Sequence, residues 1–136
     1  MALDFDRSII GSEFDRTVLE PVREEDIRAY VAASGESSPA GDPQVAPPTF
    51  VVRIRGRRFM PENMPNLGRM GFDAGKDIDF GAPIRVGDVL TAVSTVHDIY
   101  EKTGRSGSMA FLVLRTVVTN QRDEQVAVID QKMMFR

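Results

Sequence analysis

The 136-residue chain contains no cysteine and a single histidine, His97. Without cysteine it can form no disulfide, no thiol nucleophile and no cysteine metal site, which fits a reducing compartment. A zinc site normally needs several histidine or cysteine ligands, so we expect no bound metal and no other cofactor.

Long apolar runs and a strong excess of one charge are also missing. No stretch approaches the roughly 20 apolar residues that span a bilayer. The first residues, MALDFDRSIIGSEF, are acidic and unlike a signal peptide. The net charge of -3 gives no reason to expect a nucleic-acid partner. We expect a soluble, cytoplasmic protein without membrane contact, with a single domain over residues 1–136, a length that suits one hydrophobic core.

The first half of the chain contains one clear helix pattern, PVREEDIRAYVAASG. Acidic residues fill its first turn, where they complement the helix dipole. Ile27, Tyr30 and Val31 recur at helical spacing and predict one apolar face. Gly35 is suited to the end of the helix.

The second half of the chain has the pattern of β-strands. Four runs predict strands and are separated by turn residues: GKDIDFGAPI, DVLTAVSTVHDIYEK, SMAFLVLRTVVTNQ and EQVAVIDQKMMF. The last three predict an antiparallel meander. Both alternating sets of residues in the third run are largely apolar, which places that strand in mid-sheet, covered on both sides. The fold class is therefore α+β. Because a single sheet leaves one edge open, we expect a dimer with a second copy or a related chain.

Several of these segments resemble the MaoC-like hydratases. The resemblance lies in VREEDIRAYVAASGESSP, in VAPPTF, and in FDAGKDIDFGAPIRVGD with the later YEKTGRSG. Within that family the chain is most similar to the FAS1-like dehydratase, or MaoC N-terminal, domain. The resemblance implies the hot-dog fold, an antiparallel sheet wrapped around a central helix, with two chains pairing their sheets. It also implies reversible hydration of trans-2-enoyl thioesters of CoA or acyl carrier protein (ACP) to (R)-3-hydroxyacyl thioesters.

The loop after the first helix departs from the family's catalytic pattern. Active members carry Ser-Gly-Asp-x-Asn-Pro-x-His-x-Asp, in which Asp and His exchange protons with water and the substrate α-carbon. Glu36 stands where the first Asp is expected, and Gly41 replaces the His. The extra methylene of Glu36 matters because a misplacement of about 1 Å can cost about a hundredfold in rate. The segment between Asp42 and APPTF also looks shorter than in the family. Three residues match the pattern: Ser34, Gly35 and Pro39.

These departures leave several interpretations open. Glu36 and Asp42 could form an alternative carboxylate pair, which would make the chain a self-sufficient homodimeric hydratase or thioesterase. Both carboxylates could instead only shape turns. The chain would then be a non-catalytic acyl-CoA-binding protein or one subunit of a hetero-oligomer. We favour the last hypothesis, because the family includes complexes in which one chain supplies Asp and His while the other binds the acyl chain.

Two further segments are candidates for contact with an acyl-CoA or acyl-ACP thioester. In the family's layout APPTF lines the mouth of the substrate tunnel, and its hydroxyl and backbone N–H groups could hold a thioester carbonyl. The same prolines also suit the rigid start of a helix. The run RIRGRR could bind CoA or phosphopantetheine phosphates, or it could be a solvated face. The residues are Pro47, Pro48, Thr49 and Phe50 in the first segment and Arg53, Arg55, Arg57 and Arg58 in the second.

Three other features have simpler interpretations. His97 lies within a predicted strand, where a lone histidine is usually structural or exposed. Gly87 and Asp88 predict a turn. The methionine-rich stretch MPENMPNLGRM could be a flap over an acyl chain or a loop that its methionines pack against the protein.

Overall fold

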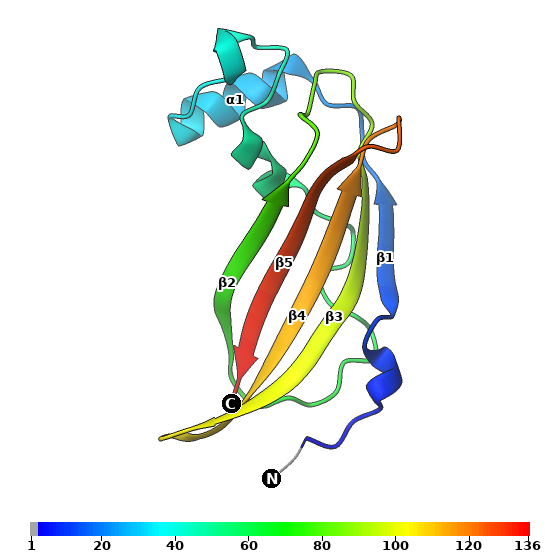
Figure 1. Cartoon of the computed structure of the whole chain (residues 1–136), viewed down its shortest axis with the longest axis vertical. Helices are drawn as coiled ribbons and strands as arrows, with labels where there is room; N and C mark the ends of the chain where they lie inside the picture. Colours follow the sequence, from blue (N-terminus) through cyan, green and yellow to red (C-terminus); the bar gives the residue numbers. More distant parts are fainter. Residues whose placement is uncertain (1–2) are drawn as a thin grey trace.

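The computed structural model describes residues 3–136, which form one five-stranded antiparallel sheet with α1 at one end and the short 3-10 helix Arg7–Ile9 near the other (Figure 1). The order of strands across the sheet is β1-β3-β4-β5-β2. The four predicted strands and the meander of the last three are confirmed, whereas the sequence pattern did not predict β1. The strands are β1 (Glu13–Val18), β2 (Gly71–Phe80), β3 (Thr91–Gly104), β4 (Gly107–Thr119) and β5 (Gln125–Phe135).

Strand β4 lies in the middle of the sheet, as predicted. It pairs with β3 on one side and with β5 on the other. Leu112, Val113 and Leu114 are consecutive, so they face alternate sides of the sheet, and all three are buried. Leu112 and Leu114 pack in an apolar cluster on one face of the sheet. On the other face Phe111 and Val117 are half-buried, so the predicted cover is complete on one face and partial on the other.

The predicted helix is α1 (Glu24–Ser34). It ends where Gly35 adopts the left-handed conformation, with a φ of 75°, that glycine tolerates best. Ile27 is fully buried, and Tyr30 and Val31 pack against the same cluster of apolar residues. The predicted apolar face is therefore confirmed.

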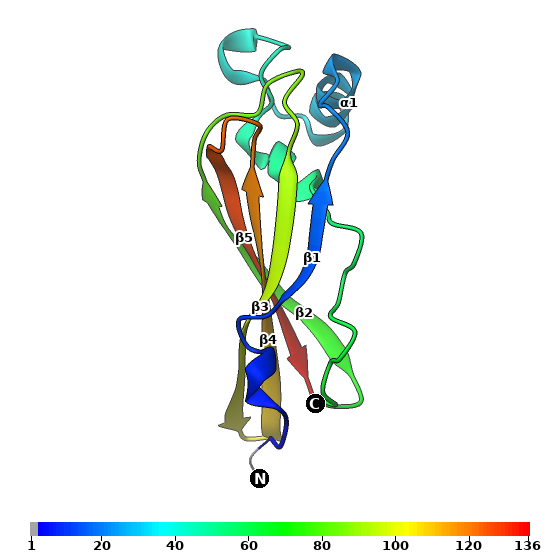
Figure 2. The same ribbon diagram turned by 90° about the vertical axis from the view of Figure 1, so that its right-hand side faces the viewer.

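The helix lies beyond one end of the strands, not along the face of the sheet (Figure 2). One face of the sheet is covered instead by the 3-10 helix η3 (Pro48–Arg53) and by the irregular segment 54–70 that follows it. Pro47 and Pro48 precede and open η3, as expected from their missing N–H groups. The helical segment is short, and by Gly56 the backbone packs so closely on Asp15 of β1 that a side chain would clash there.

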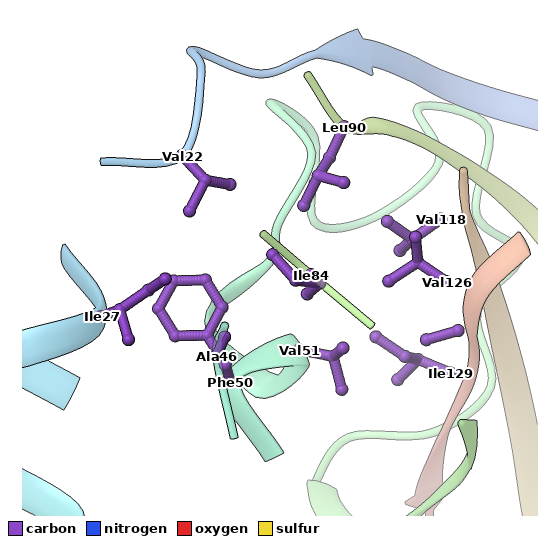
Figure 3. Packing of buried hydrophobic residues seen from close by; sticks show 11 residues of the cluster. Val22, Ile27, Ala46, Phe50, Val51, Ile84, Leu90, Val118, Val126 and Ile129 are labelled. Carbon is purple, nitrogen blue, oxygen red and sulfur yellow. The ribbon is translucent and has the colours of Figure 1, made fainter. Parts of the chain in front are cut away.

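The covered face carries two apolar clusters. The first joins α1, η3 and the adjacent ends of the strands, and Figure 3 shows Ile27 of α1 beside Phe50 of η3. The second lies further along the sheet and includes Leu67, Val96 and Leu112, with Met60 and Met64 packed against it. The methionine-rich stretch therefore packs on the sheet through two of its methionines. In residues 3–136 no helix is long and apolar enough to cross a membrane.

Candidate functional site

The loop that follows α1 is connected to the start of η3 by a chain of side-chain hydrogen bonds. The Thr49 hydroxyl donates to Glu36 Oε2 at 2.6 Å. The Tyr30 hydroxyl donates to Thr49 Oγ1 at 2.7 Å. The Tyr30 ring meets the Phe50 ring edge to face, with 5.6 Å between centroids. Three segments, α1, the loop and η3, therefore meet at one point.

The direction of this chain follows from the number of protons on each group. An ionised carboxylate only accepts hydrogen bonds, and a threonine hydroxyl has a single proton to donate. Once Thr49 donates to Glu36, Tyr30 must be the donor to Thr49. The proton of Thr49 is then not available for a ligand carbonyl, the role expected of that hydroxyl from the sequence. Sequence reasoning missed Tyr30, although a tyrosine on an apolar helix face normally needs a partner for its hydroxyl.

The other candidate carboxylate, Asp42, shapes the end of the loop. Its Oδ1 accepts the backbone N–H of Gln44 at 2.9 Å, an Asx-type turn. Within residues 3–136 no hydrogen bond joins Asp42 to Glu36, and each carboxylate has a partner of its own. The two groups therefore do not form a hydrogen-bonded pair.

The backbone of the loop explains why glycine suits the position where the family has histidine. Gly41 has a φ of 68°, and Ala40 before it has a φ of 54°. Both values lie in the left-handed region, which residues with a Cβ adopt rarely. A Cβ at position 41 would meet no atom within 4 Å, but the positive φ would strain the backbone of any residue with a side chain. The loop therefore has a conformation that glycine favours and histidine does not.

An apolar hollow of about 130 Å³ lies beside the loop. Its wall is formed by one residue of the loop, by the prolines that open η3, and by the residues that follow β2. Pro47 and Pro48, predicted to contact substrate, line the hollow, whereas Phe50 lies in the core behind them. The lining residues are Pro39, Ala46, Pro47, Pro48, Val51, Phe80, Gly81, Ala82, Pro83, Ile84 and Val126.

A second, more polar hollow of about 350 Å³ shares Pro83 with the first. It is lined by Pro83, Arg85, Arg122 and Glu124. Asn120 donates a hydrogen bond to the Glu124 carboxylate, and Arg122 donates a second; together they lower the pKa of Glu124. Within residues 3–136 the guanidinium of Arg85 has no hydrogen bond or ion pair.

The four arginines of RIRGRR are spread over the end of η3, which holds Arg53, and the start of the segment 54–70, which holds the other three. Arg53 lies over the Phe50 ring at 4.8 Å and is bonded to the carbonyl of Asp26. Arg58 pairs with Glu62. The side chains of Arg55 and Arg57 are exposed, and the backbone N–H of Arg57 is bonded to side chains of β1. This part of the run lies against β1, at the opposite edge of the sheet from β2 and the apolar hollow.

The remaining candidates lie away from the loop. His97 is exposed at an irregularity in β3, where the pairing with β4 shifts. Asp88 is buried, accepts the N–H of Arg85 at 2.9 Å and forms part of the predicted turn. Within residues 3–136 no three histidine or acidic side chains are grouped as metal ligands.

Comparison with known families shows to which family the chain belongs. The model of the FAS1-like dehydratase domain region matches residues 8–129. The chain belongs to this family. A UPF0336 protein of Streptomyces coelicolor is 29% identical to it over 153 aligned positions, which cover all of this chain and 97% of the relative. The alignment is longer than the chain, so the relative has residues for which this FAS1-like chain has no counterpart.

Solved structures confirm the fold class. The MaoC-like dehydratase of Rhodospirillum rubrum superposes with a TM-score of 0.64 at 20% identity, covering 93% of this chain and 91% of the other. The C-terminally truncated HadBC complex of Mycobacterium tuberculosis, a (3R)-hydroxyacyl-ACP dehydratase, gives 0.64 at 22% identity, covering 97% and 99%. The predicted hot-dog fold is therefore confirmed, and the family model confirms the predicted FAS1-like dehydratase domain. In this FAS1-like chain the long helix α1 lies beyond the end of the strands, and the short η3 lies on the face of the sheet.

Proposed function

We propose that the chain is the substrate-binding subunit of an (R)-specific enoyl-thioester hydratase, or 3-hydroxyacyl dehydratase, acting on acyl-CoA or acyl-ACP. A partner subunit would carry the catalytic Asp and His. The observation that supports this proposal most directly is that the loop after α1 offers no acid–base pair. Hydration needs an acid and a base on the two sides of the substrate. Here Glu36 is bonded to Thr49, Asp42 closes its own turn, and position 41 is a glycine.

The hollow beside the loop supports a role in binding. Ligand sites are concave and mostly apolar, with a few polar groups at the rim. The hollow is lined by apolar residues and glycine, and several of them are prolines, which lose little freedom when a ligand binds. Its volume of about 130 Å³ is small, so the complete thioester site would need walls from a second chain.

The edge of the sheet formed by β2 offers a place for that second chain. Strand β2 pairs with β5 on one side only, and nearly all of its residues are exposed. Phe72 and Phe80, near its two ends, are 37% and 53% exposed. An exposed edge with apolar side chains is suited to pairing with another strand.

The charge of β2 favours a different chain over a second copy. The strand GFDAGKDIDF contains three aspartates and one lysine. Pairing two such strands would bring acidic residues together, and like charges on facing strands are destabilising. A related chain with a basic edge avoids this cost. The HadBC complex, to which this chain is similar in fold, is an assembly of hydratase-type subunits and supports the same arrangement.

A self-sufficient homodimeric hydratase is the second candidate. Glu36 is exposed, and its hydrogen bond to Thr49 uses only one carboxylate oxygen, Oε2. The other oxygen could act as a general base toward water. This candidate predicts turnover by the isolated chain.

The deciding experiment follows the enoyl absorbance of crotonyl-CoA with the purified chain alone, with Glu36→Gln as the matched variant. Binding of the same thioester is measured in parallel by calorimetry. We expect binding without turnover, and turnover only after a MaoC-like chain carrying Asp and His is added. Turnover by the isolated chain that is lost in Glu36→Gln would establish the homodimeric enzyme instead. Binding without turnover under either condition would indicate a non-catalytic acyl-CoA-binding protein.

A further inference from the structure

We infer that the hydrogen bond from Thr49 to Glu36, supported by the one from Tyr30 to Thr49, acts as a latch. It holds the loop in place as one wall of the apolar hollow. Glu36 then holds the loop in place and does not transfer protons, and Tyr30 is a positioning residue. The latch itself is independent of the proposed function. Its effect on a bound thioester rests on that function.

The first observation is that the other hydrogen bonds of the loop are local and reach residues at most four positions away. Its backbone hydrogen bonds run from Gly41 to Ser38 and from Asp42 to Pro39. The N–H of Glu36 bonds to the nearby Ser34 hydroxyl. Within residues 3–136, the contact from Thr49 to Glu36 is the one hydrogen bond that ties residues 35–43 to a distant part of the chain. Removing this contact would therefore free the loop without breaking an element of the sheet.

The second observation is where the latch lies relative to the hollow. Pro39, three residues after Glu36, lines the hollow from the loop side. Pro48, next to Thr49, lines it from the side of η3. The bond between Glu36 and Thr49 thus joins two walls of the same hollow. If it opens, the distance between Pro39 and Pro48 is no longer fixed.

The third observation explains the role of Tyr30. Its ring is held against Phe50, which is buried in the core, so the position of its hydroxyl is set by packing. By donating to Thr49, Tyr30 occupies a lone pair of that oxygen and leaves the threonine proton to point at Glu36. Chains of hydrogen bonds strengthen one another, so this donor also reinforces the second bond.

The test compares Thr49→Val, which keeps the shape but removes the hydroxyl, with Thr49→Ser, which keeps the hydroxyl. Backbone amide exchange of residues 36–42 is measured in the full chain by mass spectrometry. We expect exchange about fivefold faster in Thr49→Val, the factor that corresponds to one hydrogen bond of about 1 kcal/mol. Thr49→Ser should exchange like the wild type. Tyr30→Phe should show an intermediate increase, because the bond to Glu36 persists without its reinforcing donor.

Ser37→Ala provides a control on the same loop, and its exchange should not change. Equal exchange in Thr49→Val, Thr49→Ser and the wild type would overturn the latch. Crotonyl-CoA affinity gives the second readout. We expect it to fall in Thr49→Val, measured at a temperature where that variant remains folded, and to be restored in Thr49→Ser. Unchanged affinity despite faster exchange would overturn the role of the latch in shaping the hollow. A wild-type chain that binds no thioester would refute the proposed function, while the exchange data would still decide the latch.

Discussion

Arg115 and Asp130 face each other across β4 and β5 and form two parallel hydrogen bonds of 2.8 Å each. This two-pronged geometry is the strongest form of an arginine–carboxylate contact. The hydrogen bond from Arg115 lowers the pKa of Asp130 below its ordinary value of 3.8. The pair connects two central strands on the face of the sheet opposite the two apolar clusters.

The first prediction concerns the stability that this pair provides. Asp130→Asn should lower the free energy of unfolding at pH 7 by about 1–2 kcal/mol. This loss is toward the low end for hydrogen bonds to charged groups, because Arg115 is partly exposed to solvent. Since the folded-state pKa of Asp130 is depressed, the contribution is present above 3.8 and is lost as the pH falls through the lower folded-state value. Urea unfolding at pH 7 and pH 3 measures it. Asp4→Asn, at an exposed position, serves as the control. If the loss of unfolding free energy in Asp130→Asn were the same at pH 3 as at pH 7, the prediction would be contradicted.

Most of the sheet could be predicted from the sequence because its strands have strong local signals. β3, β4 and β5 are β-branched runs bounded by turn residues, and α1 ends at the expected glycine. β1 is different. Its residues EFDRTV carry three charges and little apolar periodicity, and it is defined by backbone pairing with β3. A strand of this kind depends on its tertiary partner and not on its own pattern.

The site was only partly predictable for a related reason. Glu36 could be identified as a candidate because it occupies a known position in the loop pattern. Its contact with Thr49 depends on how far η3 lies from α1, which no local signal encodes. The positive φ angles at Ala40 and Gly41 are likewise set by the closure of the loop. The shorter stretch before APPTF, expected from the family resemblance, stays a prediction, because the alignment does not locate the missing residues.

The second prediction distinguishes a homodimer from a hetero-oligomer by the charge of β2. Asp79→Lys leaves the strand with two acidic and two basic residues. Pairing of two identical strands should then become about threefold to fivefold tighter, whereas pairing with a basic partner edge should become weaker by a similar factor. Sedimentation equilibrium of the isolated chain, and titration with a MaoC-like partner chain, measure the two changes. Asp4→Lys makes the same charge change away from the edge and should have no effect.

The third prediction asks which arginines contact the phosphates of a CoA thioester. Arg85 lines the hollow that shares Pro83 with the apolar one, and its guanidinium has no partner within residues 3–136. Arg85→Ala should weaken crotonyl-CoA binding about threefold, because an exposed ionic contact contributes about 0.2–1 kcal/mol. The double substitution Arg55→Ala and Arg57→Ala, at the opposite edge of the sheet, should change the affinity by less than about twofold.

The N-acetylcysteamine thioester of the same acid provides the control for this prediction. It lacks the phosphates, so Arg85→Ala should leave its affinity unchanged. A larger loss for CoA in the Arg55 and Arg57 double variant than in Arg85→Ala would assign the phosphate contact to the run RIRGRR, as one interpretation of the sequence holds.

The fourth prediction concerns the buried residue that anchors α1. Ile27 is fully buried beside Phe50 (Figure 3). Ile27→Ala should lower the free energy of unfolding by about 2–5 kcal/mol and Ile27→Val by about 0.5–1.5 kcal/mol, because each leaves a cavity in proportion to the atoms removed.

Tyr30 lies one turn further along the same helix face, so a loosened α1 should also weaken the contact to Thr49. We therefore expect faster exchange of residues 36–42 in Ile27→Ala even under conditions where the protein remains folded. Val18→Ala removes an apolar side chain that is 64% exposed and should change stability by less than about 0.5 kcal/mol. Unchanged exchange of the loop in a destabilised Ile27→Ala would mean that the loop is held independently of the helix.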